Sequence, residues 1–301
     1  MTLTSDAIVS SLRGDYHRVS FHPRDFLPEK LCHYTSASGL LGILRSGVLR
    51  GSNFAYLNDS SEIRYGDRIV REVLDQYFGE SRERRAQQVL QVTIGAMEKI
   101  TSHIEFYLAC FCTEADLLSQ WRGYGTSADR YCIIFDPDEL HNGTQAPEIY
   151  FDRVIYERDE QIASVTGVLD RALQAAQDMT RLDQAQQKEC AKGICNTLFQ
   201  RLVRIMCFFK HHGFHEEKEW RAVHWLQDIG KVNFETRGGS IRPYIDLFLG
   251  SDDPPKLPIR EVIVGSSAVV AQSRKSVELL IEKQGYSGIA VTESGLPYRE
   301  L

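Results

Sequence analysis

The sequence contains no run of about 18 apolar residues, which is the length that a membrane-spanning helix needs. Its opening residues, MTLTSDAIVSSLRGDYHR, also lack the apolar core of a secretory signal peptide. From these two absences we expect a cytoplasmic protein that has no membrane partner.

A surplus of basic residues is missing too. Lysine and arginine number 35 against 41 aspartates and glutamates, which leaves a net charge of −6 at pH 7. Proteins that bind nucleic acid through bulk charge are usually basic, so a long nucleic acid is not the expected partner. A local basic groove is still compatible with this composition.

Cysteine spacings typical of a metal site are absent as well. Cys110 and Cys112 are separated by Phe111 alone, and Cys190 and Cys195 have no second ligand pair nearby. The seven cysteines are odd in number, and most stand beside apolar residues. This pattern favours reduced core residues over a disulfide framework, and we expect no metal site.

What the sequence does contain is ordinary for a soluble globular protein. Hydrophobic residues make up 43% and charged residues 25% of 301 positions, without internal repeats or low-complexity tracts. This length accommodates one large domain or two of average size.

Periodicity predicts a chain of mixed helices and strands. Alternating or continuous apolar runs bounded by turn residues predict strands over 30–35, 48–53, 105–112, 130–136, 149–156, 217–225, 232–235, 240–249, 259–265 and 289–292. Helical spacing predicts helices over 39–46, within 61–104 with a break near 80–85, within 157–211, and over 273–284.

The strands that surround the helical segment 157–211 indicate how the chain is organised. This segment contains no proline and, apart from Gly167 and Gly193, no glycine, so it suits two or three helices. We therefore predict an α+β fold with a mixed or antiparallel central sheet. Its domain would span residues 30–301, with a helical insertion at about 157–210 and a lead-in segment at 1–29.

Two short segments carry clear helix-capping signals. Ser36 precedes the helical run 39–46 and Gly47 follows it, which fits an N-cap and a left-handed C-terminal residue. Asn58 and Asp59 are typical of a turn that caps the next helix.

The stretch 207–225 holds the richest combination of polar and aromatic residues. If its second half is a strand, Glu217, Glu219 and Arg221 project from one face, and Trp220 anchors the other face in a core. Two carboxylates and a guanidinium are costly to bury unless they pair or meet a polar ligand, so a polar cleft is one interpretation. A solvated edge strand in which Arg221 bridges a glutamate is the other.

The order of several motifs resembles a widespread bacterial family that is catalogued as a domain of unknown function. The resemblance covers roughly residues 30–300. Its motifs are His33-Tyr34-Thr35, Gly47, Asn58-Asp59, Phe111-Cys112, Trp121, Tyr124-Gly125, Glu217-Lys218-Glu219-Trp220-Arg221 and Val262-Ile263-Val264-Gly265. Cys112 stands where many members would have serine, which argues against a catalytic hydroxyl there.

A more distant similarity is to the ADP-ribosyltransferase superfamily, whose sites combine a histidine or arginine on an early strand, a hydroxyl or aromatic residue in a middle strand, and a late glutamate. His33 resembles the first residue, and Glu217-x-Glu219 looks like the paired-glutamate strand. This resemblance implies an enzyme with NAD as co-substrate that cleaves the nicotinamide–ribose bond. The acceptor of ADP-ribose would be a protein, a nucleic acid, a small molecule or water, in phage defence or a toxin-like role.

The same resemblance implies roles for individual residues. Glu219 would stabilise the oxocarbenium-like transition state, and Glu217 would act as general base on the acceptor. His33 would orient the dinucleotide. The remaining cofactor-binding residues would be Tyr34 and Thr35 beside His33, Trp121 or Tyr124 stacked on nicotinamide, and Arg50 or Arg221 paired with pyrophosphate.

Two other classes of function fit the same residues. Glu216-x-Lys218 with an upstream acid such as Asp152 resembles a metal-dependent nuclease. A non-catalytic nucleotide-sensing or interaction module is the third reading. His211, His212 and His215 have no fixed ligand geometry, and each single candidate, such as His33 or Trp121, also suits an ordinary core position.

Overall fold

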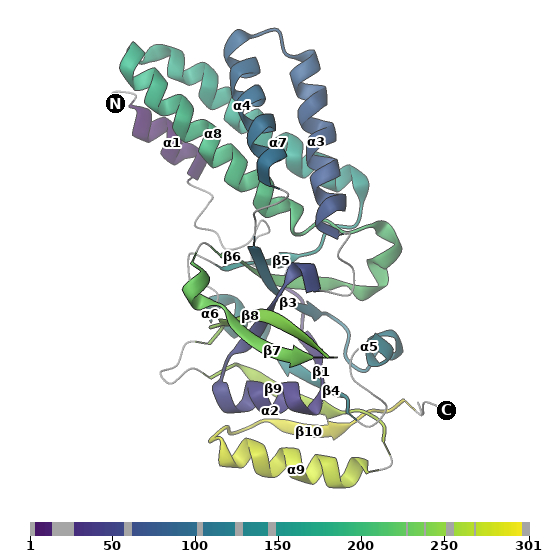
Figure 1. Cartoon of the computed structure of the whole chain (residues 1–301). Helices are drawn as coiled ribbons and strands as arrows, with labels where there is room; N and C mark the ends of the chain where they lie inside the picture. Colours follow the sequence, from purple (N-terminus) through teal and green to yellow (C-terminus); the bar gives the residue numbers. More distant parts are fainter. Residues whose placement is uncertain are drawn as a thin grey trace. The chain divides into compact units, whose positions relative to one another are not determined.

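The computed structural model describes residues 4–13, 27–56, 62–100, 105–123, 129–143, 149–226, 228–237, 239–250, 256–267 and 269–296. The chain forms two compact units (Figure 1). The helical unit comprises Met1–Val19, Leu57–Glu105 and Val154–His215. The sheet unit comprises Ser20–Tyr56, Phe106–Arg153 and Glu216–Leu301.

The helical unit is built around one long helix, α8 (Gln184–Met206). Its other elements are α1 (Ser5–Arg13), α3 (Glu62–Glu80), α4 (Arg84–Ile100), α7 (Arg158–Asp178) and the short 3-10 helix η3 (Met179–Arg181). All of these elements contact α8. Close packing requires glycine where α3 meets the end of α8, because a Cβ on Gly66 would lie 2.4 Å from the carbonyl oxygen of Met206.

The sheet unit contains a ten-stranded sheet with the order β10-β9-β4-β1-β3-β2-β8-β7, and β6 joins β5 to β3. The strands are β1 (Leu31–Thr35), β2 (Leu49–Asn53), β3 (Glu105–Cys112), β4 (Tyr131–Phe135), β5 (Ile149–Arg153), β6 (Glu219–Leu226), β7 (Asn233–Arg237), β8 (Ser240–Leu247), β9 (Ile259–Val264) and β10 (Ala290–Glu293). β9 and β10 are parallel, whereas β1, for example, is antiparallel to both β3 and β4. The predicted α+β class with a mixed sheet is therefore confirmed.

Short helices and turns complete the sheet unit. They are α2 (Ala37–Ser46), η2 (Phe54–Tyr56), α5 (Leu118–Gly123), α6 (Pro137–Gly143), η5 (Ile229–Lys231) and α9 (Val270–Lys283). The 3-10 helix η4 (His212–Glu217) leads from the helical unit into β6.

Alternation along the strands gives the sheet two different faces. The first, which we call the thiol face, carries a buried cluster of Cys32, Tyr34, Cys112, Trp121, Cys132, Ile134 and Ile263. The second, the aromatic face, carries Phe111, whose ring centroid lies 5.8 Å from those of Phe135 and Phe151. Phe151 in turn lies 5.5 Å from Trp220.

The capping signals around α2 are confirmed. The Ser36 side chain accepts a hydrogen bond from the backbone N–H of Gly39 at 3.2 Å. Gly47 ends the helix with φ 68°, a left-handed conformation that glycine adopts at least cost. The predicted turn at Asn58 and Asp59 lies outside the described residues.

Three element boundaries differ from the sequence-based expectation. Residues 137–143 form α6, which was not predicted, because Pro137 begins a helix as readily as it ends a strand. β5 ends at Arg153, and Ile155 makes only an isolated bridge to Phe209. β6 begins at Glu219 because Lys218 has φ 42°, which does not continue a strand.

The predicted helices within 157–211 correspond to α7, η3 and α8, and they pack with α3 and α4. Whether residues 30–301 behave as one domain stays a prediction, as does the role of residues 1–29 as a lead-in. In the part of the chain that the structure describes, no helix has both the length and the apolarity needed to cross a membrane.

Candidate functional site

The β6 strand holds a buried pair of opposite charges. Arg221 donates from Nε to Glu219 Oε1 at 2.7 Å and from Nη2 to Oε2 at 2.9 Å, which is a bidentate arrangement. The two residues are only 2% and 5% exposed. Alternation along the strand places both side chains on one face, so the guanidinium fixes the orientation of the carboxylate.

A second carboxylate faces this pair from the neighbouring strand. In the antiparallel ladder between β5 and β6, Asp152 lies opposite Arg221 and is 1% exposed. Directly opposed side chains of an antiparallel pair are close neighbours on one face. We call Asp152, Glu219 and Arg221 the acid–arginine cluster, because its two carboxylates and one guanidinium lie on neighbouring strands of the sheet.

The residue before this strand is strained and tied to a distant loop. Lys218 has φ 42°, which is unusual for a residue other than glycine. Its Nζ lies 2.7 Å from Glu114 Oε1, in the loop that follows β3. The hydrogen bond and positive charge of Lys218 lower the pKa of the Glu114 carboxyl below its usual value.

The loop after β3 is itself held by several hydrogen bonds. The Tyr34 hydroxyl accepts from the backbone N–H of Leu117 at 2.8 Å and donates to the carbonyl oxygen of Glu114 at 3.3 Å. Asp116, with φ 57°, accepts from Trp121 Nε1 at 2.8 Å. Burial and the neighbouring thiols raise the pKa of Tyr34, so its hydroxyl stays protonated and able to donate.

The cysteines of the thiol face are embedded rather than reactive. A hydrogen bond with Cys32 and burial raise the pKa of the Cys112 thiol, and only the thiolate is a strong nucleophile. None of the seven cysteines forms a disulfide. These observations agree with the interpretation of reduced core residues.

His33 belongs to the opposite face of the sheet. The pairing of Cys32 with Cys112 sets His33 beside Phe111, and their ring centroids are 5.9 Å apart. His33 Nδ1 lies 2.9 Å from the carbonyl oxygen of Cys110. A carbonyl oxygen only accepts, so Nδ1 carries the proton in this bond.

The structure therefore brings only part of the predicted site residues to one face. Trp220 contacts Phe151 on the aromatic face, where His33 also lies, and Thr35 shares the strand alternation of His33. Glu219 and Arg221 alternate with Trp220 and project from the thiol face. Tyr34 and Trp121 lie on that same thiol face.

The remaining predicted residues have other surroundings. Trp121 is 2% exposed and stands edge-on to Tyr34 at 4.8 Å, as a core aromatic does. Arg50 is paired at the surface with Glu235 at 2.6 Å. Glu217 ends η4 and precedes the strand, while Tyr124 lies outside the described residues. Their proposed roles stay predictions.

His212 and His215 belong to the exposed turn η4, and His211 directly precedes it. His212 Nδ1 lies 2.9 Å from Glu157 Oε1, and its ring stacks on that of His215 at 4.8 Å. Within the described ranges, no group of three or more metal-type ligands is arranged to hold an ion.

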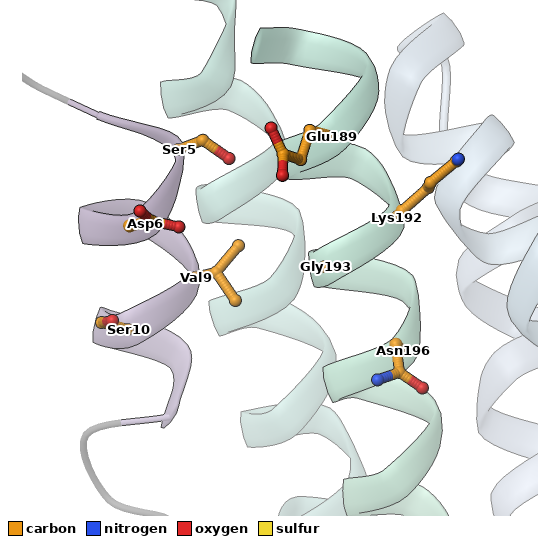
Figure 2. A pocket seen from close by; sticks show the side chains of 8 residues that line it. All are labelled: Ser5, Asp6, Val9, Ser10, Glu189, Lys192, Gly193 and Asn196. Atoms are coloured by element: carbon orange, nitrogen blue, oxygen red, sulfur yellow. The ribbon is translucent and has the colours of Figure 1, made fainter.

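A hollow of about 360 Å³ lies in the helical unit between α1 and α8 (Figure 2). Val9 points toward Gly193, and a Cβ on that glycine would lie 2.7 Å from the valine side chain. Its polar lining consists of Ser5, Asp6, Ser10, Glu189, Lys192 and Asn196. None of the predicted site residues lines it, so we do not place the chemistry there.

Sequence reasoning did not identify Glu114 and Asp116 as parts of the site. Glu114 and Lys218 lie far apart along the chain, so neither spacing nor periodicity connects them. The position of Lys218 between two glutamates was a signal in the sequence that it could belong to the site. In a strand with regular alternation, however, Lys218 would project from the face opposite Glu217 and Glu219.

Neither the curated proteins nor the solved structures include a match to this chain. Over residues 120–222, which contain the whole acid–arginine cluster, the chain matches the family described as "Protein of unknown function (DUF2971)", and this confirms the predicted resemblance to a domain-of-unknown-function family.

Proposed function

We propose that this chain is an NAD-using, ADP-ribosyltransferase-like enzyme that cleaves the nicotinamide–ribose bond. The order of three strands carries the proposal. β1 with His33 pairs with β3, and β3 pairs with β6, which bears Glu219. The resemblance implies an early strand, a middle strand and a late strand that bears the glutamate, and these three strands are direct neighbours.

Glu219 is suited to stabilise positive charge. Cleavage of the nicotinamide–ribose bond develops an oxocarbenium-like centre, which a fixed carboxylate stabilises without reorganising. The two hydrogen bonds from Arg221 hold the Glu219 carboxylate in one orientation. A carboxylate that is already oriented lowers the activation free energy more than one that is merely nearby and mobile.

The two sheet faces change the role that we assign to His33. Since His33 and Glu219 project from opposite faces, one ribose does not touch both. We place the reacting end of NAD on the thiol face at Glu219, and we assign His33 the task of holding β1 to β3 through the Cys110 carbonyl oxygen.

A specific observation also favours a second candidate, a metal-dependent nuclease. Asp152 lies on the strand next to Glu219, opposite Arg221, and Arg221 pairs with Glu219. Two carboxylates and a basic side chain are the minimum that such a nuclease uses to hold Mg²⁺ and a phosphate. This version replaces Glu216-x-Lys218 by Glu219-x-Arg221.

The experiment that tests the first proposal follows NAD cleavage. Purified wild type is incubated with NAD labelled in the nicotinamide ring or in the adenosine, beside Glu219→Gln and Glu278→Gln. Glu278 forms an exposed ion pair with Arg274 on α9 and serves as the matched control. We expect nicotinamide release from wild type and control, and about a 100-fold slower release from Glu219→Gln.

Lysate proteins and nucleic acids added to the same reaction identify the acceptor by the adenosine label that they carry. If folded wild type releases no nicotinamide with or without lysate, the transferase proposal fails. Cleavage of nucleic acid that needs no NAD and stops with EDTA would establish the nuclease instead.

A further inference from the structure

The start of β6 has a backbone conformation that needs an explanation. Lys218 directly precedes Glu219 and has φ 42°. In this region the Cβ of a residue other than glycine crowds the backbone, so the conformation persists only where its surroundings hold it. Whatever holds Lys218 also sets the direction in which Glu219 leaves the turn.

The side chain of Lys218 forms an ion pair with Glu114, at 2.7 Å. Both side chains are exposed, by 56% and 46%, and a pair of this kind is normally mobile. Here one end is anchored, because the backbone carbonyl of Glu114 accepts from the Tyr34 hydroxyl and, at 3.1 Å, from the Cys112 thiol. The carboxylate is therefore presented from a fixed loop.

A second strained residue lies in the same loop. Among the described residues, Asp116 and Lys218 are the two that are not glycine and have positive φ. Asp116 is held by Trp121 Nε1 and by the backbone N–H of Gly295, both at 2.8 Å. Strained backbone that is held from several sides is typical of functional sites.

We infer that Glu114 and Lys218 form a positioning clamp that fixes the orientation of Glu219. The inference rests on the proposed function of Glu219. The clamp holds the backbone before Glu219, and Arg221 holds its carboxylate from the other side. Without the clamp, Lys218 relaxes to negative φ, the peptide unit before Glu219 rotates, and the carboxylate moves away from its oriented position.

The first test compares turnover with cofactor affinity. For Glu114→Gln we expect kcat for nicotinamide release to fall about tenfold while KM for NAD stays within about twofold, because only the orientation of Glu219 changes. The reversed pair, Glu114→Lys with Lys218→Glu, restores kcat to within about threefold of wild type. Glu278→Gln, which breaks an exposed pair on α9, leaves both parameters unchanged.

The backbone itself supplies a second comparison. Lys218→Gly and Lys218→Ala both remove the ion pair, but glycine adopts positive φ without crowding. We expect Lys218→Gly to keep about threefold more activity than Lys218→Ala. Equal losses in the two variants would mean that the left-handed backbone plays no part, and the clamp would be rejected.

A readout that does not depend on activity separates the clamp from the proposed reaction. The NMR signal of the Arg221 Nε–H reports its hydrogen bond to Glu219, and it should shift in Glu114→Gln but not in Glu278→Gln. An unshifted signal together with unchanged kcat overturns the clamp. If the signal shifts in Glu114→Gln but wild type releases no nicotinamide, the transferase proposal is overturned and the clamp stands as a property of β6.

Discussion

The buried contact between Arg221 and Glu219 shows how burial changes what an ion pair does. Removing both charges from water costs several kcal/mol, which the bidentate hydrogen bonds offset only while both partners are present. The pair between Arg50 and Glu235 has a similar distance, 2.6 Å, but its side chains are 49% and 28% exposed. Water screens that pair, so it contributes little.

This contrast leads to a prediction for stability. Arg221→Met removes the guanidinium that makes two hydrogen bonds to the buried Glu219 carboxylate, and we expect it to lower the free energy of unfolding by about 3–5 kcal/mol. Arg50→Met breaks the exposed pair and should cost less than about 1 kcal/mol. Urea denaturation of both variants measures the difference, and equal losses would contradict a buried cluster.

At the scale of single residues, the sequence indicated that charged side chains would pair but not where they would lie. The charges of Glu219 and Arg221 predicted that both side chains need partners, and one interpretation already paired Arg221 with a glutamate. Their burial did not follow, since it depends on β5 lying beside β6. The sequence did not predict the contact between Glu114 and Lys218, because that contact depends on the positive φ of one lysine.

Among the secondary-structure elements, α2 was predicted best because its limits are set locally. Ser36 and Gly47 act on backbone groups within one turn of the helix. The faces of the sheet were not predictable in this way. The opposite placement of His33 and Glu219 depends on the register of β1 with β3 and on the contact of Phe151 with Trp220, which sequence periodicity does not specify.

Two glycines at α2 give a matched prediction at this scale. Gly47→Ala introduces a Cβ at φ 68° and should lower the free energy of unfolding by about 1 kcal/mol. Gly42→Ala lies inside the helix, where a new Cβ meets nothing nearer than Arg50 Nη2 at 3.8 Å, and should raise it by about 0.5–1 kcal/mol. Thermal unfolding distinguishes them, and a stabilising Gly47→Ala would contradict the left-handed cap.

For the whole molecule, the sequence indicated helices at 157–211 but not their partners. The helical unit also takes α3 and α4, which lie between β2 and β3 in the chain. Amphipathic stripes predict that a helix has a buried side, but they do not say which other helix covers it. The division of one chain into interleaved units is therefore a property of tertiary packing.

The prediction of a single domain for residues 30–301 can be tested with a substitution in one unit and a probe in the other. Gly66→Val should destabilise the helical unit strongly, since even a Cβ there lies 2.4 Å from the Met206 carbonyl oxygen. The three tryptophans, Trp121, Trp220 and Trp225, all belong to the sheet unit.

In a single cooperative domain, Gly66→Val lowers the urea midpoint of tryptophan fluorescence and of helical circular dichroism together, because neither unit survives the unfolding of the other. In two independent domains, the circular dichroism signal separates into two steps and the fluorescence midpoint stays at its wild-type value. We expect the first result, because the chain runs from β5 through residues 154–215 of the helical unit to β6, so loss of that unit frees the ends of both strands that carry the acid–arginine cluster.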